Sequence, residues 1–425
     1  MADTSDVVVV GAGPGGCATA LHLARRGHEV VLLDRVDGGV DDGVDGAGRP
    51  GGKVCGEGLM PHGRAALERL GVPTHTLGQP FVGIAYHAGR ASAQAAFGAG
   101  RLGLGTRRSA FDPALRALVR AEPAIRVREG VRVTGLTGQP GAMRLATSAG
   151  PVTARVVVGA DGLHSTVRKL AGLEAPARGP RRYGARMHLR LAAGRREPEH
   201  VHVHAAGGWE AYLTPVGPGE VNVALLLGAS AARRLKGDRD GGFRALVTHI
   251  EPLAGLFDGA EPRSDVAVCG PLRQRVRAAS TDGVVLVGDA AGFVDAVTGE
   301  GMSLTLLSAE LAAECVSAGL ATGRLGRRWL GTYAERRRRL VRTLCTLTEV
   351  VVFGLRHPWW AERVVAALGR RSASFERFLA VQTGEGSLWS LAPALAGVTL
   401  AFLDPRTTRA VRAGLGSPNG QLAVG

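Results

Sequence analysis

The chain has 425 residues and a mass of 44.0 kDa, roughly two to three domains' worth, which excludes a small scaffold that depends on disulfides or zinc. Apolar residues make up 45% of it and charged residues 21%, which excludes a disordered chain and a multi-span membrane protein. Two values stand out: 63 glycines and a formal net charge of +15. That charge is compatible with nucleic acid, an anionic membrane surface or an acidic ligand.

Arginine carries almost all of the positive charge. Only Lys53, Lys169 and Lys236 are lysines among the 52 basic residues, and the arginines are spread along the chain. With the abundant Ala and Gly, this bias indicates a GC-rich coding sequence, and no helix-turn-helix, RRM or zinc-finger pattern accompanies it. We therefore expect no nucleic-acid partner.

Cysteine usage and the chain ends favour a cytoplasmic protein. The five cysteines include no C-x-x-C pair, which argues against a disulfide framework or a zinc ribbon. The N-terminus has no basic region followed by an apolar stretch of signal-peptide length. The apolar run Leu388–Leu403 contains Pro393 and is shorter than the ~20 residues of a membrane-spanning helix, so we expect a buried or interfacial helix there.

The first 34 residues predict a strand, a helix and a second strand. Asp6–Val10 is a β-branched run typical of a strand buried on both faces, and the glycine-rich stretch Gly11–Gly16 follows at once. Cys17–Arg26 has small and apolar residues at helical spacing, and Gly27 ends it. Glu29–Asp34 is a second buried strand, so the order is that of a βαβ unit.

Helical and strand patterns continue to residue 159. Residues 36–52, rich in glycine and aspartate, are expected to form a mobile surface insertion. The expected elements after it are helices at Pro61–Leu70 and Phe111–Arg120 and strands within 80–98 and at Gly150–Gly159. The second of these helices would begin at the Asp112-Pro113 start signature.

The pattern changes near residue 180. Short strands joined by Gly and Pro turns predict a mostly antiparallel sheet, with strands at Gly184–Leu191, His200–His204, Glu210–Pro215 and Val221–Leu227. Gly283–Asp289 then reads as another buried parallel strand and Met302–Ala321 as a long apolar helix. From Tyr333 onward the pattern is helical.

Gly11, Gly13 and Gly16 form a G-x-G-x-x-G motif between the first strand and its helix. Gly11 permits the tight turn, Gly13 lets the backbone approach a pyrophosphate, and Gly16 lets helix and strand pack closely. The helix N-terminus offers N–H groups and a positive dipole end to the phosphates. Asp34 is placed to accept hydrogen bonds from ribose hydroxyls. The pattern predicts a bound dinucleotide, NAD or FAD.

Three blocks in this order resemble the FAD-dependent monooxygenase and geranylgeranyl-reductase superfamily, which includes the flavin-dependent halogenases and shares a para-hydroxybenzoate-hydroxylase-like fold. They are the glycine loop through Asp34, Val156–Ser165 (VVVGADGLHS) and Val284–Met302 (VVLVGDAAGFVDAVTGEGM), and they extend over most of residues 1–320. The resemblance implies FAD, with NAD(P)H as reductant.

The resemblance also implies an α/β fold class: a Rossmann-like FAD-binding domain, a second, mostly antiparallel β-sheet domain for the substrate, and a C-terminal helical region. The implied boundaries are 1–79, 100–178 and 264–325 for the FAD-binding domain, 80–99 and 179–263 for the substrate domain, and 326–425 for the helical region.

The resemblance assigns cofactor contacts residue by residue. Asp161 and Gly162 would hold the FAD diphosphate region and contact the nicotinamide cofactor, and Asp289 would accept a hydrogen bond from a ribityl hydroxyl. Arg108 would face the FAD, since a guanidinium suits pyrophosphate. The expected cofactor-binding residues are Gly11, Gly13, Pro14, Gly16, Asp34, Arg35, Arg108, Val133, Asp161, Gly162, Gly288, Asp289, Gly299, Gly301 and Met302.

Cys55, Glu210 and Tyr212 are the candidate catalytic residues. Lys53–Leu59 (KVCGEGL) resembles the C-G-(E/D/G)-G-L segment that lies beside the flavin ring in the geranylgeranyl-reductase and halogenase-like branch, although a cysteine can equally be a small buried hydrophobe. Glu210 and Tyr212 share one face of a strand and would line the substrate pocket or belong to the core.

No metal site is expected. His200, His202 and His204 share one face of a predicted strand, but no metal-ligand cluster is evident around them. We interpret them as a polar sheet face.

Several functions fit these motifs. The favoured one is an NAD(P)H-dependent monooxygenase of secondary metabolism that hydroxylates an aromatic or polyketide-like small molecule through a C4a-hydroperoxyflavin. The alternative is a geranylgeranyl-reductase-like enzyme that reduces C=C bonds of a prenyl or quinone substrate; Arg336–Arg339 supports it, because a lipid substrate favours peripheral docking on an anionic membrane. A halogenase is a further alternative, although the W-x-W-x-I-P stretch is absent, and so is a non-catalytic flavoprotein.

Overall fold

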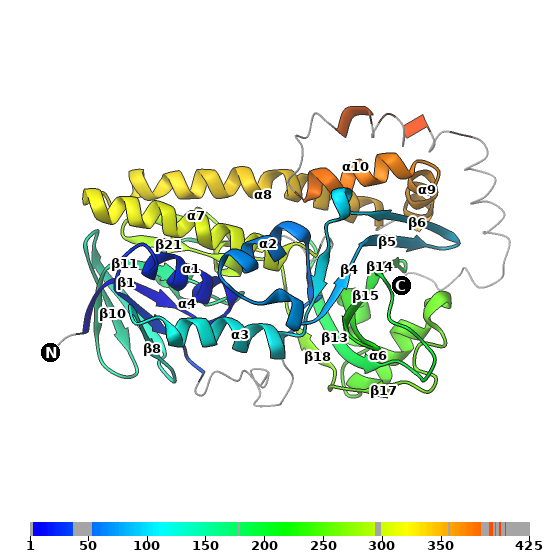
Figure 1. Ribbon diagram of the computed structural model, residues 1–425, viewed down its shortest axis with the longest axis horizontal. Coiled ribbons are helices and arrows are strands. Elements are labelled where there is room, and N and C mark those ends of the chain that lie inside the picture. Colours follow the sequence, from blue (N-terminus) through cyan, green and yellow to red (C-terminus); the bar gives the residue numbers. More distant parts are fainter. Residues whose placement is uncertain are drawn as a thin grey trace.

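The structure is a computed structural model that describes residues 3–36, 53–176, 179–293, 299–355, 358–383, 391–393, 396, 399–400 and 404 (Figure 1). The insertion expected at 36–52 lies outside the described residues apart from Val36, and so does most of the apolar run 388–403.

The N-terminal sheet has eight strands, of which six follow the order β20-β21-β11-β1-β2-β8. The central strands β21, β11, β1, β2 and β8 are parallel, and the hairpin β9–β10 adds to β11 in antiparallel fashion. The bounds are β1 Asp3–Val10, β2 Val30–Leu33, β8 Ile125–Arg128, β9 Val133–Gln139, β10 Ala142–Thr147, β11 Val152–Gly159, β20 Ser280–Thr281 and β21 Val284–Leu286.

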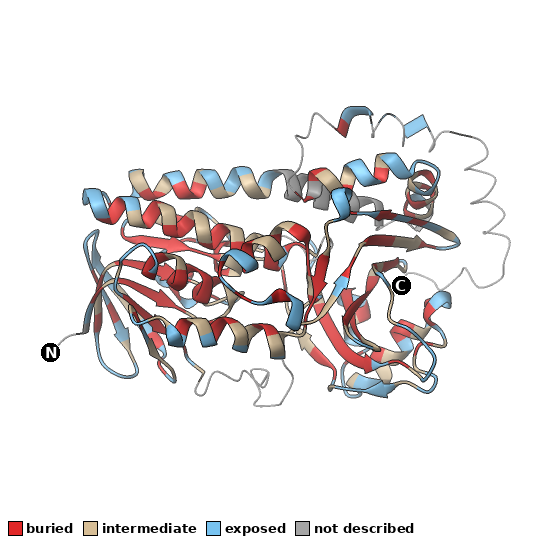
Figure 2. Ribbon diagram, in the orientation of Figure 1, coloured by how far each residue is buried: buried red, intermediate tan, exposed pale blue. Residues whose placement is uncertain are grey.

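Continuous β-branched runs form the centre of this sheet, as their sequence predicts. Val7, Val8 and Val9 of β1 and Val156–Val158 of β11 are fully buried, because helices cover the sheet. The covering helices include α1 (Pro14–Ala24) and α7 (Gly301–Thr322), which pack on each other. Figure 2 shows buried residues along these strands and along the inner side of α7.

The second sheet also has eight strands, in the order β17-β13-β16-β15-β14-β5-β6 with β18 beside β13. Its pairs are antiparallel except for β14 with β5, so the expectation of a mostly antiparallel sheet is confirmed. The bounds are β5 Gly83–Ala88, β6 Ala91–Ala96, β13 Arg182–Arg190, β14 His200–Ala205, β15 Trp209–Gly217, β16 Glu220–Gly228, β17 Glu261–Pro262 and β18 Ala267–Cys269.

Helices cover both faces of the second sheet. Phe243 of α6 (Arg239–Thr248) belongs to the apolar cluster on one face, and Phe375 of α10 (Ser372–Gln382) belongs to the cluster on the other. Helix α9 (Pro358–Gly369) packs beside α10 on the second of these faces. Side chains alternate between the two faces along each strand, so the sheet contributes residues to both apolar clusters.

A small three-stranded sheet lies between the two large ones. It has the order β3-β7-β4, with bounds Gly58–Leu59, Gly103–Gly105 and Gln79–Phe81. A Cβ on Gly105 would lie 1.7 Å from the carbonyl oxygen of Pro215 on β15. Only glycine permits this close approach of β7 to the second sheet.

The remaining elements are short or peripheral, apart from α3 and α8. They are α2 Pro61–Arg69, α3 Arg108–Ala121, α4 Thr166–Leu170, α5 Ala229–Arg233, α8 Arg327–Leu355, β12 Glu174–Ala175, β19 Arg275–Val276, and the 3-10 turns Thr74–Thr76, Gly98–Gly100, Glu251–Leu253 and Gly288–Ala291. In Figure 1, α8 lies along α7 on the side away from the N-terminal sheet.

Helix α3 corrects one expectation. It begins at Arg108 and not at the Asp112-Pro113 signature, so Pro113 lies inside the helix. The physical reason is a cap from a distant segment, since the backbone N–H of Arg108 donates to Oε1 of Glu57 at 2.9 Å. The carboxylate satisfies an N-terminal N–H group that otherwise has no partner within the helix.

One described helix, α7, is long and apolar enough to cross a membrane, with a mean hydropathy of 1.4 over its most apolar 18-residue window. Half of that window is buried inside the protein, as in the core helix of a globular domain.

Replacing Phe243 tests the packing of the second sheet. This side chain is fully buried, so Phe243→Ala should lower the free energy of unfolding by about 3–5 kcal/mol. The control Leu170→Ala, at a position that is 38% exposed, should change it by less than about 1 kcal/mol. Urea unfolding of both variants measures the difference, and equal effects would contradict the packing described.

Candidate active site

The glycine loop leaves an open space at the start of α1. A Cβ on Gly16 would lie 1.8 Å from the carbonyl oxygen of Gly11, and one on Gly11 would lie 2.6 Å from that of Ala160, so both positions require glycine. At Gly13 the backbone is extended, and the nearest atom to an added Cβ is Nζ of Lys53 at 3.7 Å. No side chain caps α1, and Pro14 is its first residue. The loop can therefore admit a phosphate beside Gly13, with an ammonium close by.

Asp34 lies at the end of β2, where the sequence places it, but its carboxylate already has protein partners. Oδ2 accepts hydrogen bonds from the backbone N–H of Ala12 at 3.3 Å and from Nη2 of Arg116 at 2.7 Å. Arg116 is itself buried, so this is a buried ion pair. The backbone N–H of Val131 donates to the carbonyl oxygen of Asp34, which brings the chain before β9 to the same place.

Two expected residues near Asp34 have different surroundings. Arg35 is exposed at the end of β2. The side chain of Val133 is buried in the apolar core of the N-terminal sheet, so a contact with a cofactor there would involve its backbone.

The carboxylate of Asp161 caps a helix. It accepts hydrogen bonds from the hydroxyl of Ser165 and from the backbone N–H groups of Thr166, at 2.6 Å, and Val167, at 3.0 Å. Gly162 has φ +79°, the left-handed region that favours glycine. Both residues lie directly after β11, but the side chain of Asp161 serves α4 in this structure.

Asp289 lies in the turn after β21, and its backbone is held by Arg168. The guanidinium of Arg168, only 1% exposed, donates to the carbonyl oxygens of Asp289 and Ala290 at 3.5 and 3.3 Å. Burial raises the pKa of the Asp289 carboxyl, against nearby cations that include Arg108 and Lys53. Among the described residues, no hydrogen bond reaches this carboxylate, which suits a hydroxyl donor from a ligand.

A buried acid lies directly before the first residue of α7. Glu300 is only 1% exposed, and its Oε2 lies 3.0 Å from Nε2 of His62 on α2. Met302 is buried beside it, and Gly299 has φ +67°. Gly301 is the first residue of α7, and no side chain caps this end either.

The Cys55–Glu57 segment joins the two large sheets. The amide of Asn222 on β16 donates to the carbonyl oxygen of Cys55 at 2.8 Å, and the hydroxyl of Thr214 on β15 donates to that of Gly56 at 2.8 Å. Burial raises the pKa of the Cys55 thiol, so the thiol is protonated at neutral pH.

Glu57 itself is buried, with φ +58°, an uncommon conformation for a residue other than glycine. Its Oε2 lies 2.6 Å from Nε2 of His188 on β13. Nδ1 of that ring accepts from Arg186 at 3.1 Å, because a guanidinium can only donate, so Nε2 carries the proton that His188 donates to Glu57. One carboxylate thus binds both α3, through Arg108, and the second sheet.

The remaining candidates are already engaged in contacts within the protein. The Arg108 guanidinium forms a two-pronged ion pair with Asp112, with distances of 2.7 and 2.6 Å. Glu210 is buried in an ion pair with Arg182. Tyr212 packs in the apolar cluster that also contains Phe375. Of the two strand candidates, Glu210 therefore balances a buried charge and Tyr212 contributes apolar surface.

Sequence reasoning missed several residues of this site. It named Lys53 only as the first residue of the Lys53–Leu59 segment, and it did not single out Glu57, Arg116, Arg168 or His62. Each acts through a partner far away in the chain, so local spacing carries no signal for it. The glycine motif alone points to the region in which Lys53 and Arg116 lie.

The residues present fit FAD. The open space at Gly13, the uncapped end of α1 and the ammonium of Lys53 suit a diphosphate. The half-buried Asp289 carboxylate, without a hydrogen-bond partner among the described residues, suits a flavin-side hydroxyl. Known proteins support the same cofactor: a family profile described as an FAD binding domain matches residues 101–348, and one described as FAD dependent oxidoreductase matches residues 6–70.

The chain belongs to this family of FAD-dependent oxidoreductases. It is 30% identical over 345 residues to menaquinone reductase of Mycolicibacterium smegmatis, which covers 75% of this chain and 78% of that one. It is 33% identical over 172 residues to kynurenine 3-monooxygenase of Salinispora arenicola, which covers 38% and 37%. A flavoprotein/dehydrogenase from Cytophaga hutchinsonii has the same fold, with a TM-score of 0.79, 18% identity and coverage of 97% and 100%.

Two glycine variants separate cofactor binding from folding. Gly13→Ala adds a methyl group to open space, so the apoprotein should keep its stability while FAD binds at least about tenfold more weakly. Gly16→Ala, which would place a Cβ 1.8 Å from a carbonyl oxygen, should destabilise the fold itself. Flavin fluorescence titration and thermal unfolding of both apoproteins measure these effects, and unchanged FAD affinity in Gly13→Ala would contradict the assignment.

Glu57 provides a second prediction. Glu57→Ala leaves the N–H groups of Arg108 and His188 buried without their acceptor, which should lower the free energy of unfolding by about 2–4 kcal/mol. Glu57→Gln retains one acceptor and should have about half that effect. Chemical unfolding of the FAD-loaded variants compares them. An unchanged free energy of unfolding in Glu57→Ala would show that the carboxylate does not join the two sheets.

Proposed function

We propose that this protein is an FAD-dependent reductase that adds two hydrogens across a carbon–carbon double bond of a prenyl lipid such as a quinone side chain, with NAD(P)H as the reductant. The relation to menaquinone reductase over 75% of the chain supports this more than the relation to a monooxygenase over 38% of it. The sequence motifs alone favour hydroxylation, whereas the longer match to a reductase favours prenyl reduction.

The single observation that carries the proposal is the neutral thiol of Cys55. Reduction of a double bond requires a hydride at one carbon and a proton at the other, and bound reduced FAD supplies the hydride. The Cys55 thiol holds a proton, because burial raises its pKa. Thr214 and Asn222 hold the backbone of its segment at 2.8 Å each, and the backbone N–H of Glu57 donates to its sulfur at 3.4 Å. A thiol with a raised pKa is a weak acid, so it gives up this proton only to a carbon that has already gained negative charge from the hydride.

An apolar cluster begins beyond the C-terminal end of this segment. Met60 and Phe81 belong to it with Tyr212 on the second sheet and with Phe375 and Leu379 on α10. Cys55 itself packs against the apolar core of the N-terminal sheet. Its thiol therefore has apolar neighbours, which suit a prenyl chain.

The arginine run Arg336–Arg339 contributes less to a membrane surface than its sequence indicates. Nη2 of Arg336 lies 2.7 Å from Glu314, and Arg338 and Arg339 both pair with Glu335. The proposal therefore depends on the site and not on attraction to an anionic surface.

Hydroxylation is the second candidate, since the sequence identity to kynurenine 3-monooxygenase, 33%, is higher than the 30% identity to menaquinone reductase. In that case the reaction consumes O₂ and needs no acid at Cys55. The two reactions therefore differ in both their oxygen requirement and their dependence on this residue.

Anaerobic turnover tests the proposal. With NADH or NADPH and a menaquinone, the enzyme should form a product two hydrogens heavier without O₂, as measured by mass spectrometry. Cys55→Ala should lower this rate by about 10²–10⁴-fold while FAD binding is kept, because it removes the proton donor.

Cys315→Ala is the matched control, since this buried thiol on α7 lies beside Thr332, away from the flavin-binding residues, and should leave the rate unchanged. Oxygen consumption coupled to an oxygenated product, with full activity in Cys55→Ala, would favour the monooxygenase instead.

A further inference from the structure

Three histidines meet on the second sheet, on the face away from the candidate active site. His87 lies on β5, and His202 and His204 lie on the neighbouring parallel strand β14, where the register places His204 opposite His87. His204 also lies opposite Ala211 of β15, which packs in the cluster under α6. The next residue, Tyr212, packs on the other face. The histidines therefore do not belong to the flavin side of the sheet.

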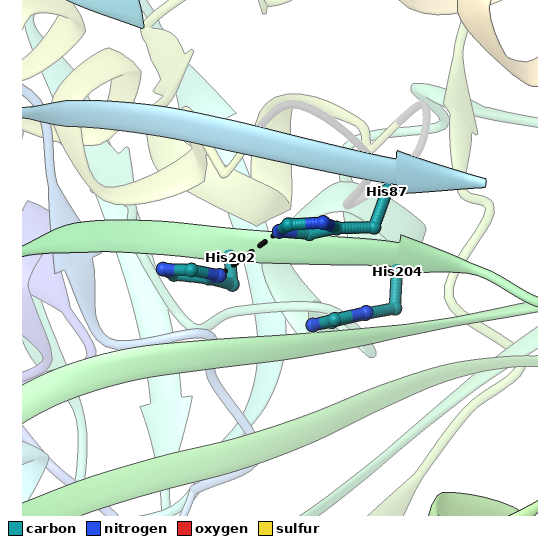
Figure 3. A group of neighbouring side chains, drawn as sticks. All are labelled: His87, His202 and His204. Carbon is teal, nitrogen blue, oxygen red and sulfur yellow. Dashed lines mark hydrogen bonds between the residues drawn. The ribbon is translucent and has the colours of Figure 1, made fainter. Parts of the chain in front are cut away.

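The three imidazoles lie close together (Figure 3). One ligand nitrogen of each lies within 4.8 Å of those of the other two, and Nε2 of His87 is 2.9 Å from Nδ1 of His202. The ring centroid of His87 lies 5.0 Å from that of His202 and 4.4 Å from that of His204. Two backbone strands in one sheet thus hold the rings in place before any ligand binds.

The rings are neutral at physiological pH. Burial lowers the pKa of His87, and it lowers those of His202 and His204 to about 4 and about 3, with a further contribution from the neighbouring imidazoles. A neutral imidazole has one N–H group and one lone pair, and the lone pair is what a metal ion requires. Stacked cationic rings would repel one another and a metal ion alike.

One nitrogen in the cluster is unsatisfied. His204 is only 3% exposed, and its Nδ1 has no hydrogen-bond partner among the described residues. A buried polar atom without a partner destabilises the folded protein, and a ligand that binds it removes that cost. His87 and His202 can satisfy each other through their 2.9 Å hydrogen bond, whereas Nδ1 of His204 has no such partner among the described residues.

We propose that His87, His202 and His204 form a binding site for a divalent transition-metal ion of the zinc class, with one ring nitrogen from each as ligand. Imidazole is a preferred ligand for Zn²⁺, Cu²⁺ and Ni²⁺, whereas Mg²⁺ and Ca²⁺ prefer oxygen. Three protein nitrogens leave a fourth position for water. His87 and His202 are only half-buried, so an ion can enter from solvent.

The distances between the ring nitrogens are near those of a bound site. In tetrahedral zinc sites with Zn–N bonds of about 2.0–2.1 Å, ligand nitrogens are about 3.3 Å apart. The His87–His202 pair, at 2.9 Å, must open by about 0.4 Å, and the most distant nitrogens, at up to 4.8 Å, must approach by up to about 1.5 Å. The rings lie nearly parallel, with interplanar angles of 10° between His87 and His202 and 14° between His87 and His204, so the side chains must also rotate until the three lone pairs converge on the ion. The shared proton moves to the other nitrogen of its ring, so no charge is created.

Such an ion would link two segments that are 115 residues apart in the chain, β5 and β14. The β5–β6 hairpin is the edge of the second sheet and the surface on which α9 and α10 pack. Metal binding should therefore stabilise this edge against unfolding.

Zinc titration of the whole FAD-loaded protein tests the site. After dialysis against a chelator, Zn²⁺ should bind with one equivalent per chain in competition with a chromophoric chelator. His204→Ala should weaken this binding at least about 100-fold. Added Zn²⁺ should raise the unfolding temperature of the unmodified protein but not that of the variant. Co²⁺ in place of Zn²⁺ should give the visible absorption bands of a tetrahedral site.

His200→Ala is the matched control, since His200 lies on the same strand face but outside the cluster; it should bind Zn²⁺ within about threefold of the unmodified protein. If His204→Ala fails to hold FAD, His87→Gln at a half-buried position decides, and it too should lose affinity. Absence of one-to-one binding, or a Zn²⁺ affinity in both cluster variants that is unchanged from the unmodified protein, would overturn the proposal and leave a neutral hydrogen-bonded stack.

Discussion

The buried carboxylate of Glu57 is the contact on which the arrangement of the site depends. One of its oxygens accepts the first N–H of α3 and the other accepts the proton of His188 on the second sheet. A carboxylate that is only 1% exposed is tolerated only when such partners surround it. The pair of contacts therefore holds the FAD-binding half and the second sheet in one relative position, and Cys55 lies two residues away on the same segment.

Burial also sets the chemistry of the groups around that segment. It raises the pKa of the Cys55 thiol and of the Asp289 carboxyl, because removal from water disfavours the charged form of each group. Part of the positive charge is paired inside the protein: Arg116 is paired with Asp34 and Arg182 with Glu210.

The elements with strong periodicity were predictable, and the contacts between them were not. The valine runs of β1 and β11 read as buried strands because both faces are covered, and α7 begins one residue before its expected start. The predicted start of α3 was wrong because the cap of this helix comes from Glu57, 51 residues earlier in the chain. The histidines of β14 read as a polar face because their third partner, His87, belongs to a strand that no pattern connects to β14.

The sequence by itself determined the cofactor class and the order of the elements, because the glycine spacing, the strand before it and the helix after it are all local. The tertiary structure decided which distant side chains share a site: Lys53 beside Gly13, Glu57 between Arg108 and His188, and His87 beside His204. These pairings depend on strand register and on burial, which are properties of the folded chain and not of any short stretch of residues.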